Sequence, residues 1–257
     1  SPYRDKELKI HVSLAFSIRP RRGVPRTERD VRMSRFIDRE NEIFGVPQEF
    51  KAEGLELVVV GDYGVSAYQH RFSVDADLVL RSEDLEGFTQ VLEDQGFEKA
   101  TDRDLVYSGR YLAYLKDEEL PVTIDLLVDE LQCRQTDASW SYQYFEGHSV
   151  EKEIEGSEES VQVRVPSEEL LIAVKLHSGR LTDARDVVAL IEDAEMEEVE
   201  KHIDRGDRER LRQVLENIEQ TISDTDFEDS FKGVFSQNTL PTKQIQRLQG
   251  FIQEVTE

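Results

Sequence analysis

Residues 55–80 read LELVVVGDYGVSAYQHRFSVDADLVL, and this stretch decides which fold we expect. The apolar run 55–60 predicts a buried strand, which a glycine-bounded turn and a short helix follow. The alternating residues 73–80 then predict a second strand. Because side chains two positions apart on a strand point to the same face, we expect Asp75 and Asp77 to lie side by side.

Two neighbouring carboxylates repel each other, which raises their pKa values unless a positive charge lies between them. A divalent cation supplies that charge, and oxygen ligands of this kind suit magnesium. The turn at Gly61 exposes backbone N–H groups just before a helix, an arrangement that suits a phosphate group. Metal-binding aspartates close to a phosphate-binding turn indicate chemistry on a nucleoside triphosphate.

A third aspartate lies in the apolar run VTIDLLV, residues 122–128. Burying Asp125 in the middle of an apolar strand costs free energy unless a metal, a base or a hydrogen-bond network compensates. If this strand pairs with the earlier one, then Asp75, Asp77 and Asp125 can converge on one or two divalent ions. In such a site the first two aspartates bridge the metals, and Asp125 orients or deprotonates the attacking hydroxyl.

The rest of the chain reads as strands first and helices last, which favours an α+β fold. We expect one domain over 1–160, with an N-terminal strand and helix, and a helical domain over 161–257. The expected strands cover 8–18, 55–60, 73–80, 104–116 (a strand or a hairpin), 122–128 and 161–165. The expected helices cover 28–44, 64–70, 83–95, 168–179, 182–194, 195–222 (one or two) and 241–255. Gly45 and Pro47 are expected to end the first helix, 129–160 to form a loop, and 223–240 to be a polar tail.

Composition limits the class of protein. Hydrophobic residues make up 38% of the 257 residues, which is enough for a core but lean, and the single Cys133 excludes an internal disulfide. No run of about 18 apolar residues exists, so we expect no membrane span. The start, SPYRDKELKIHV, lacks the apolar region of a signal peptide. These features favour a soluble cytoplasmic protein.

The chain is strongly acidic, with 55 acidic against 32 basic residues and a net charge of −23. Such acidity repels anionic polymers at ordinary salt and favours solubility. It is tolerable in molar salt, where the Debye length falls to about 3 Å. The pattern is typical of a halophilic archaeal cytoplasmic protein, and an acidic mesophilic protein is the alternative.

One segment opposes this trend. Residues 19–35, RPRRGVPRTERDVRMSR, hold seven arginines against Glu28 and Asp30, a local charge of +5. Arginine forks bind phosphate well, so a polyphosphate or an RNA backbone is a natural ligand. The alternative is an arginine-rich helix start that pairs with the acidic body.

These motifs resemble the DNA-polymerase-β-like nucleotidyltransferase superfamily. Its signature is a strand, a Gly-Gly or Gly-Ser turn, a helix, an Asp-x-Asp strand and a third acid on a later strand. The matching segments are Gly61-Asp62, RFSVDAD over 71–77 and TIDLL over 123–127. The most similar subgroup looks like the AbiEii-type toxin nucleotidyltransferases, which add a proline-led helix with Lys-Leu, then Arg and Asp. The subgroup's positions are matched by Arg71, Ser73, Asp75, Asp77, Lys175, Arg180, Asp183 and Asp186.

The resemblance covers about residues 55–190 and implies a nucleotidyltransferase-type mixed sheet with flanking helices. It implies transfer of a nucleoside monophosphate from an NTP to a hydroxyl, with Mg²⁺ or Mn²⁺ as cofactor. The implied catalytic and metal-binding residues are Asp75, Asp77 and Asp125. The implied nucleotide- and phosphate-binding residues are Gly61, Arg71, Ser73, Lys175 and Arg180.

The residue types suit these implied roles. Arg71 and Lys175 can neutralise phosphate charge. Ser73 can hydrogen-bond a phosphate oxygen or hold the metal-binding strand. Arg180, with Asp183 or Asp186, favours a polar lock between helices that positions Lys175.

The resemblance also implies an acceptor hydroxyl on a tRNA end, another RNA or a protein. The implied setting is a toxin–antitoxin pair or phage defence, with an antitoxin protein as partner. The arginine-rich residues 19–35 would suit an RNA acceptor, because phosphate contacts supply salt-dependent affinity.

Asp62 departs from the family pattern, which has a second Gly or a Ser at this position. An anionic side chain here repels a triphosphate unless it turns away or binds a cation. The alternative function is therefore a catalytically weakened nucleotide-binding or partner-binding module of the same fold. A metal-dependent phosphohydrolase is disfavoured, because His70, His148 and His177 lack metal-ligand spacing.

Overall fold

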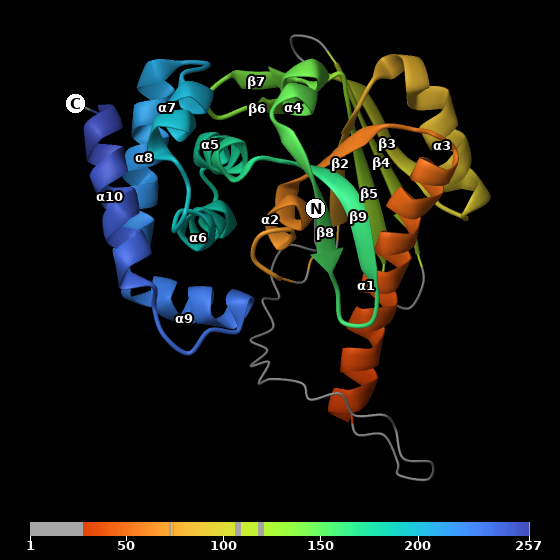
Figure 1. Ribbon diagram of the computed structural model, residues 1–257, viewed down its shortest axis with the longest axis horizontal. Coiled ribbons are helices and arrows are strands. Elements are labelled where there is room, and N and C mark those ends of the chain that lie inside the picture. The colour runs from red at the N-terminus through yellow and green to blue at the C-terminus, as the bar shows by residue number, and fades with distance from the viewer. Residues whose placement is uncertain (1–27, 72, 74, 106–108, 118–120, 257) are drawn as a thin grey trace.

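The computed structural model describes residues 28–71, 73, 75–105, 109–117 and 121–256 (Figure 1). The strand expected over 8–18 and residues 19–27 of the arginine-rich segment lie outside the described residues. Within them, a sheet with helices on both faces occupies one side of the molecule, and a group of helices occupies the other.

The central sheet has five strands in the order β1-β2-β5-β4-β3. Strands β2 and β5 are parallel, and the other neighbouring pairs are antiparallel. The five strands are β1 (Leu57–Val60), β2 (Asp75–Leu80), β3 (Glu98–Asp104), β4 (Arg110–Lys116) and β5 (Val122–Val128). The two strands that carry the aspartates are therefore neighbours in the centre of a mixed sheet.

One face of the sheet is covered by α1 (Glu28–Ala52) and α3 (Leu85–Asp94), which bury their apolar side chains against it. The prediction that the first helix ends near residue 44 is wrong, because α1 continues through Pro47. A proline inside a helix removes one hydrogen bond and costs several kcal/mol. Here Val46 and Phe50 are completely buried on the sheet, and this burial offsets the cost.

The opposite face is covered over β1 and β2 by β6 (Glu130–Cys133), β7 (Ala138–Ser141) and α4 (Tyr142–Gly147). Trp140 and Phe145 pack there against valines of β1 and β2. A further hairpin, β8 (Ser149–Glu155) and β9 (Ser160–Pro166), packs against β1 and α1. The loop predicted over 129–160 is therefore wrong for most of its length.

The helical part contains α5 to α10, which share one apolar core. Its elements are α5 (Glu168–Ser178), α6 (Leu181–Leu190), α7 (Met196–Ile203), α8 (Arg208–Ile222), α9 (Thr225–Phe235) and α10 (Thr242–Thr256). Ser167 caps α5 by accepting a hydrogen bond from the Leu170 backbone N–H at 3.3 Å. Helix α9 corrects the polar tail expected over 223–240, because Phe227, Phe231 and Phe235 bury one face of it.

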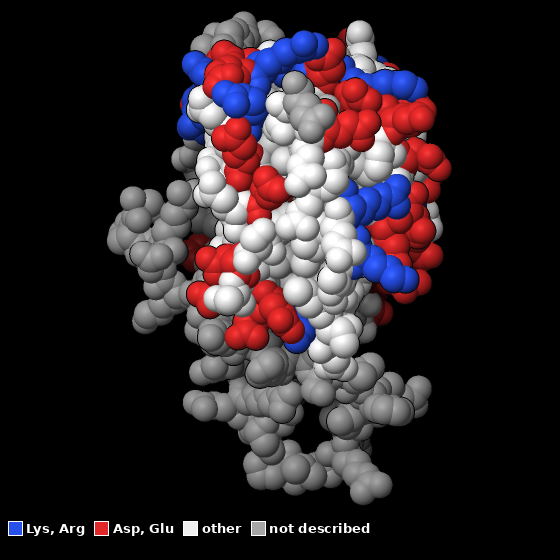
Figure 2. Space-filling view, turned by 90° about the vertical axis from the view of Figure 1, so that its left-hand side faces the viewer, with Lys and Arg blue, Asp and Glu red and all other residues white. Residues whose placement is uncertain are grey.

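The helical part follows the sheet in the chain, as expected, while the predicted boundary near residue 160 stays a prediction. In the part of the chain that the structure describes, no helix is both long and apolar enough to span a membrane. Figure 2 shows the side of the molecule where α8 and α10 lie. Basic side chains there lie beside acidic ones, as Arg212 does with Glu209 and Glu216, and form no continuous basic surface.

Candidate functional site

The pairing of β2 with β5 brings the three aspartates together. Asp77 lies directly opposite Asp125, and Asp75 lies opposite Thr123. Residues opposite each other in a sheet point to the same face, and so do residues two apart on one strand. Asp75, Asp77 and Asp125 therefore share the face of the sheet opposite α1 and α3.

The electrostatics of this face are those of crowded carboxylates. Burial, followed by the charges of Asp75 and Asp125, raises the pKa of Asp77 to about 8. Burial also raises the pKa of Asp125 to about 6, although a hydrogen bond from Tyr111 opposes the shift. At neutral pH the metal-free site therefore retains a proton that a bound cation would displace.

Two further observations fit a divalent cation. The Oδ1 atom of Asp125 is buried without a hydrogen-bond partner, so its lone pairs could satisfy a cation or a reacting hydroxyl. The Oδ1 atom of Asp75 is held by the Ser73 hydroxyl at 3.0 Å. Carboxylate oxygens are the ligands that Mg²⁺ prefers. Among the described residues, no three acidic, histidine or cysteine side chains already surround one point, so binding would require these carboxylates to rotate.

Gly61 is the first residue of α2 (Gly61–Ser66) and lies against the Asp77 side chain. Its φ is +61°, and a Cβ at this position would lie 2.0 Å from Oδ2 of Asp77. Glycine is therefore required both by the left-handed backbone and by the approach of the Asp77 carboxylate. The helix starts here, three residues before the expected start at 64.

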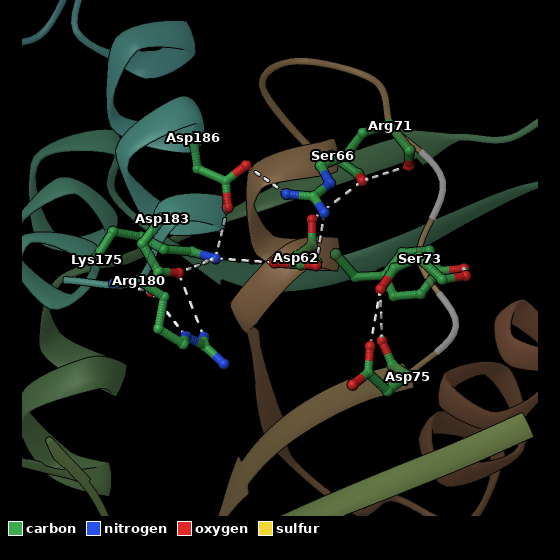
Figure 3. A network of polar contacts seen from close by, with 10 residues as sticks. Asp62, Ser66, Arg71, Ser73, Asp75, Lys175, Arg180, Asp183 and Asp186 are labelled. Carbon is green, nitrogen blue, oxygen red and sulfur yellow. Dashed lines mark hydrogen bonds and ion pairs between the residues drawn. The ribbon is translucent and has the colours of Figure 1, made fainter. Parts of the chain in front are cut away.

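Charged side chains from two parts of the chain form a buried network beside this turn (Figure 3). Lys175 of α5 contacts three carboxylates, those of Asp186 at 2.7 Å, Asp62 at 2.9 Å and Asp183 at 3.1 Å. Arg71 contacts Asp62 at 2.7 Å and also pairs with Asp186. The network ties α2 and the loop after it to helices α5 and α6.

Asp62 stays ionised in this network, and two cationic side chains compensate its charge. Although burial raises the pKa of its carboxyl, Lys175 and Arg71 lower it to about 2. Figure 3 shows the Asp62 carboxylate between these two cations. The negative charge of Asp62 is therefore paired with two cationic side chains.

The predicted phosphate-binding cations differ in how accessible they are. The side chains of Arg71 and Lys175 are 8% and 4% exposed and are engaged with carboxylates. Arg180 is 63% exposed and contacts Asp183 at 2.8 Å. The hydrogen bond to Asp183 and the charges of Asp183, Asp62 and Asp77 raise the pKa of Arg180, so its guanidinium lies within electrostatic reach of Asp77. The Ser73 hydroxyl is engaged with Asp75.

Two residues near the aspartates had no signal in the sequence. Arg39 of α1 is 9% exposed, and its Nε is buried without a hydrogen-bond partner. Burial lowers its pKa, while Tyr63 and Asp75 act in the opposite direction, which places the guanidinium within electrostatic reach of Asp75. Tyr111 of β4 lies close enough to Asp125 for the two groups to shift each other's pKa. A single sequence does not reveal either contact, because each joins segments separated by turns or hairpins.

Neither a protein-family model nor a curated protein matches this sequence. The structure is similar to that of JHP933 from Helicobacter pylori, with a TM-score of 0.50 at 14% identity over 86% of this chain and 92% of that chain. This similarity shows a shared fold and supports the predicted α+β class.

Two other solved structures are similar at a TM-score of 0.42. One is the lincosamide antibiotic adenylyltransferase LnuA with lincomycin bound, at 20% identity over 60% of this chain and 98% of that chain. The other is a candidate nucleotidyltransferase from Helicobacter pylori, at 14% identity over 90% of this chain and 96% of that chain.

We expect Gly61→Ala to destabilise the protein by about 1–3 kcal/mol and to displace the Asp77 carboxylate, because of the positive φ and the contact with Asp77. Urea unfolding measures the change. The control is Gly250→Ala in α10, where a Cβ meets nothing within 4 Å. A gain of up to about 1 kcal/mol is expected there, since alanine is the better helix former. Equal effects at both positions would contradict the close approach.

We expect Lys175→Met to cost about 3–5 kcal/mol near neutral pH, because it leaves buried carboxylates without their common partner. The folded-state pKa of Asp62 is depressed from 3.8 to about 2, so its stabilising contribution is present above pH 3.8. That contribution is lost as the pH falls through about 2.

Thermal unfolding should be measured from pH 7 to pH 2. The difference in Tm between wild type and the Lys175→Met variant should become smaller at acid pH. Lys201→Met, which removes an exposed partner of Glu198, should change stability little at any pH. A difference in Tm that stays constant down to pH 2 would contradict the pairing of Lys175 with an ionised Asp62.

We expect Asp75→Asn to lower the pKa of Asp77 from about 8, because it removes one of the repelling charges while burial remains. Carbon-13 NMR of labelled aspartate, assigned with Asp77→Asn, follows this titration in metal-free protein. Asp102→Asn on the exposed strand β3 is the control. A pKa near 4 for Asp77 in wild-type protein would refute the claim that burial and neighbouring carboxylates raise it.

Proposed function

We propose that this chain is a divalent-cation-dependent nucleotidyltransferase. It transfers a nucleoside monophosphate from an NTP to an acceptor hydroxyl and releases pyrophosphate. The observation that carries the proposal is the register of β2 and β5, which puts Asp77 opposite Asp125 with Asp75 on the same face. The contact of Gly61 with Asp77 adds support, because it brings a side-chain-free turn up to the carboxylates.

Asp75, Asp77 and Asp125 would hold the cation. Bound there, Mg²⁺ or Mn²⁺ supplies positive charge for the triphosphate and the departing pyrophosphate. The buried carboxylates supply the negative charge and oxygen donors that such an ion needs. Because Asp77 keeps a proton near neutral pH, loading of the site would release that proton.

Asp125 is the residue best suited to take the proton of the acceptor hydroxyl. Its Oδ1 is buried without a hydrogen-bond partner, which leaves an acceptor for that proton. As this proton moves to Asp125, the acceptor oxygen forms a bond to the α-phosphorus. The bond from that phosphorus to the bridging oxygen breaks, and pyrophosphate leaves with both bonding electrons.

The cations have two different roles in this proposal. Arg180 is the accessible one and would contact the triphosphate. Lys175 and Arg71 act indirectly. They pair with the Asp62 carboxylate, which would keep it from the phosphates, and they fix the turn at Gly61. Ser73 orients Asp75 through its hydroxyl.

The acceptor proposed from the sequence is an RNA or tRNA end or a protein hydroxyl, in a toxin–antitoxin or defence setting. The arginine-rich residues 19–35 would supply phosphate contacts to an RNA. An antitoxin would be a protein partner that blocks the transfer.

The second candidate function is a nucleotide-binding or partner-binding module without transfer activity. The observation that favours it is the engagement of Lys175 and Arg71 with Asp62, Asp183 and Asp186. Two cations that the resemblance assigns to phosphate are then unavailable for it.

We expect wild-type protein with Mg²⁺ to incorporate label from at least one α-³²P-labelled NTP into total RNA or total protein. The double variant Asp75→Asn, Asp77→Asn should lower the rate at least about 100-fold, because it removes the cation ligands. The matched control is Asp102→Asn with Asp104→Asn, an Asp-x-Asp pair on the exposed edge strand β3.

The control pair should leave incorporation within about twofold of wild type, since exposed charges on β3 contribute little to the site. Binding of each NTP by calorimetry separates the two candidate functions. NTP binding without incorporation supports the binding module. Incorporation that survives the Asp75 and Asp77 substitutions refutes these aspartates as the catalytic site.

A further inference from the structure

Strand β4 places a tyrosine beside the proposed base. In the antiparallel pairing of β4 with β5, Ala113 lies opposite Asp125 and Tyr111 lies opposite Leu127. Tyr111 and Ala113 therefore share the face of Asp125, with Tyr111 at the diagonal position, which long aromatic side chains can span. Ala113, directly opposite Asp125, carries only a methyl group and offers the carboxylate no hydrogen-bond partner.

The Tyr111 hydroxyl lies close enough to the Asp125 carboxylate for their interaction to affect the pKa values of both groups. The Oδ1 atom of that carboxylate is buried without a hydrogen-bond partner. The carboxylate thus has a hydroxyl neighbour that can orient it and one oxygen without a partner. An orphaned buried acceptor costs free energy in a structural role, but a reacting hydroxyl can satisfy it.

The ring of Tyr111 is itself held in place. Arg103 of β3 lies opposite Tyr111 in the β3–β4 register, and its guanidinium carbon lies 4.7 Å from the ring centroid. A guanidinium over a phenol ring is attracted by the ring's negative face, which restricts the ring from rotating away from the sheet. Arg103, Tyr111 and Asp125 therefore form a row across three strands.

We propose that Tyr111 is a positioning residue for the transfer reaction, holding the Asp125 carboxylate so that Oδ1 faces the acceptor hydroxyl. The inference rests on the proposed function and adds a residue that the sequence resemblance did not contain. The phenol keeps its own proton throughout. The acceptor proton passes to Oδ1 while the acceptor oxygen bonds to the α-phosphorus and pyrophosphate departs.

The test compares Tyr111→Phe with Tyr114→Phe. Tyr114 is on the same strand, but it is buried on the opposite face, in the core with Leu112 and Leu126. Tyr111→Phe keeps the ring under Arg103 and removes the hydroxyl alone. With the NTP and acceptor pool that wild type labels, kcat should fall about 10–100-fold, the range typical of partners that orient site ligands.

The KM for the NTP should stay within about twofold in both variants, and Tyr114→Phe should leave kcat within the same margin. Calorimetric NTP titration gives the fraction of binding-competent molecules, so that kcat is expressed per site. A loss of kcat explained by fewer competent sites would overturn the inference.

A double-mutant cycle with Asp125→Asn separates positioning from general structural damage. If Tyr111 acts through Asp125, adding Tyr111→Phe to Asp125→Asn should cause less than a twofold further loss of rate. Multiplicative losses would overturn the inference, as would an unchanged kcat in Tyr111→Phe. In both cases wild-type transfer shows that the proposed function stands, whereas wild type without transfer refutes both.

Discussion

The contact of one ammonium group with three carboxylates organises the site. Lys175 of α5 meets Asp62, Asp183 and Asp186 while its own side chain is only 4% exposed. Burial opposes a charged lysine, yet the three acids more than compensate and its pKa is raised above the ordinary value. Since Asp62 follows Gly61 directly, this contact fixes the turn that meets Asp77. Helix α5 of the helical part thereby helps to position the turn that contacts Asp77 in the sheet.

Sequence patterns predicted the sheet well where residues are strongly apolar or alternate. The expected strands over 55–60, 73–80 and 122–128 contain β1, β2 and β5, which are neighbours in the sheet, and the spacing of Asp75 and Asp77 determined their common face. The charged edge strand β3 and the strands between 130 and 155 carried little signal, because their stability comes from tertiary contacts. The alternating residues 161–165, in contrast, correctly predicted β9. For α9 a signal existed, since three phenylalanines recur every four residues.

The site was harder to predict than the fold, because charge pairing is not encoded locally. The types of Arg71, Lys175 and Asp186 were visible, yet more than 100 residues separate Arg71 from its partner in α6. Local reasoning treated Asp62 as an obstacle to phosphate, whereas tertiary contacts neutralise it. Arg39 belongs to a helix that local rules ended at a proline, and no spacing in the sequence connects it with Asp75.

Arg180 precedes α6 as its N-cap residue, and the Asp183 carboxylate accepts hydrogen bonds from both its backbone N–H and its guanidinium. The same guanidinium is the most accessible cation of the network. An anion that takes the Nε and Nη2 donors of Arg180 would compete for them with Asp183. Occupancy would then be linked to fraying of the first turn of α6, so that tighter ligand binding and a firmer helix end are opposing demands on one side chain.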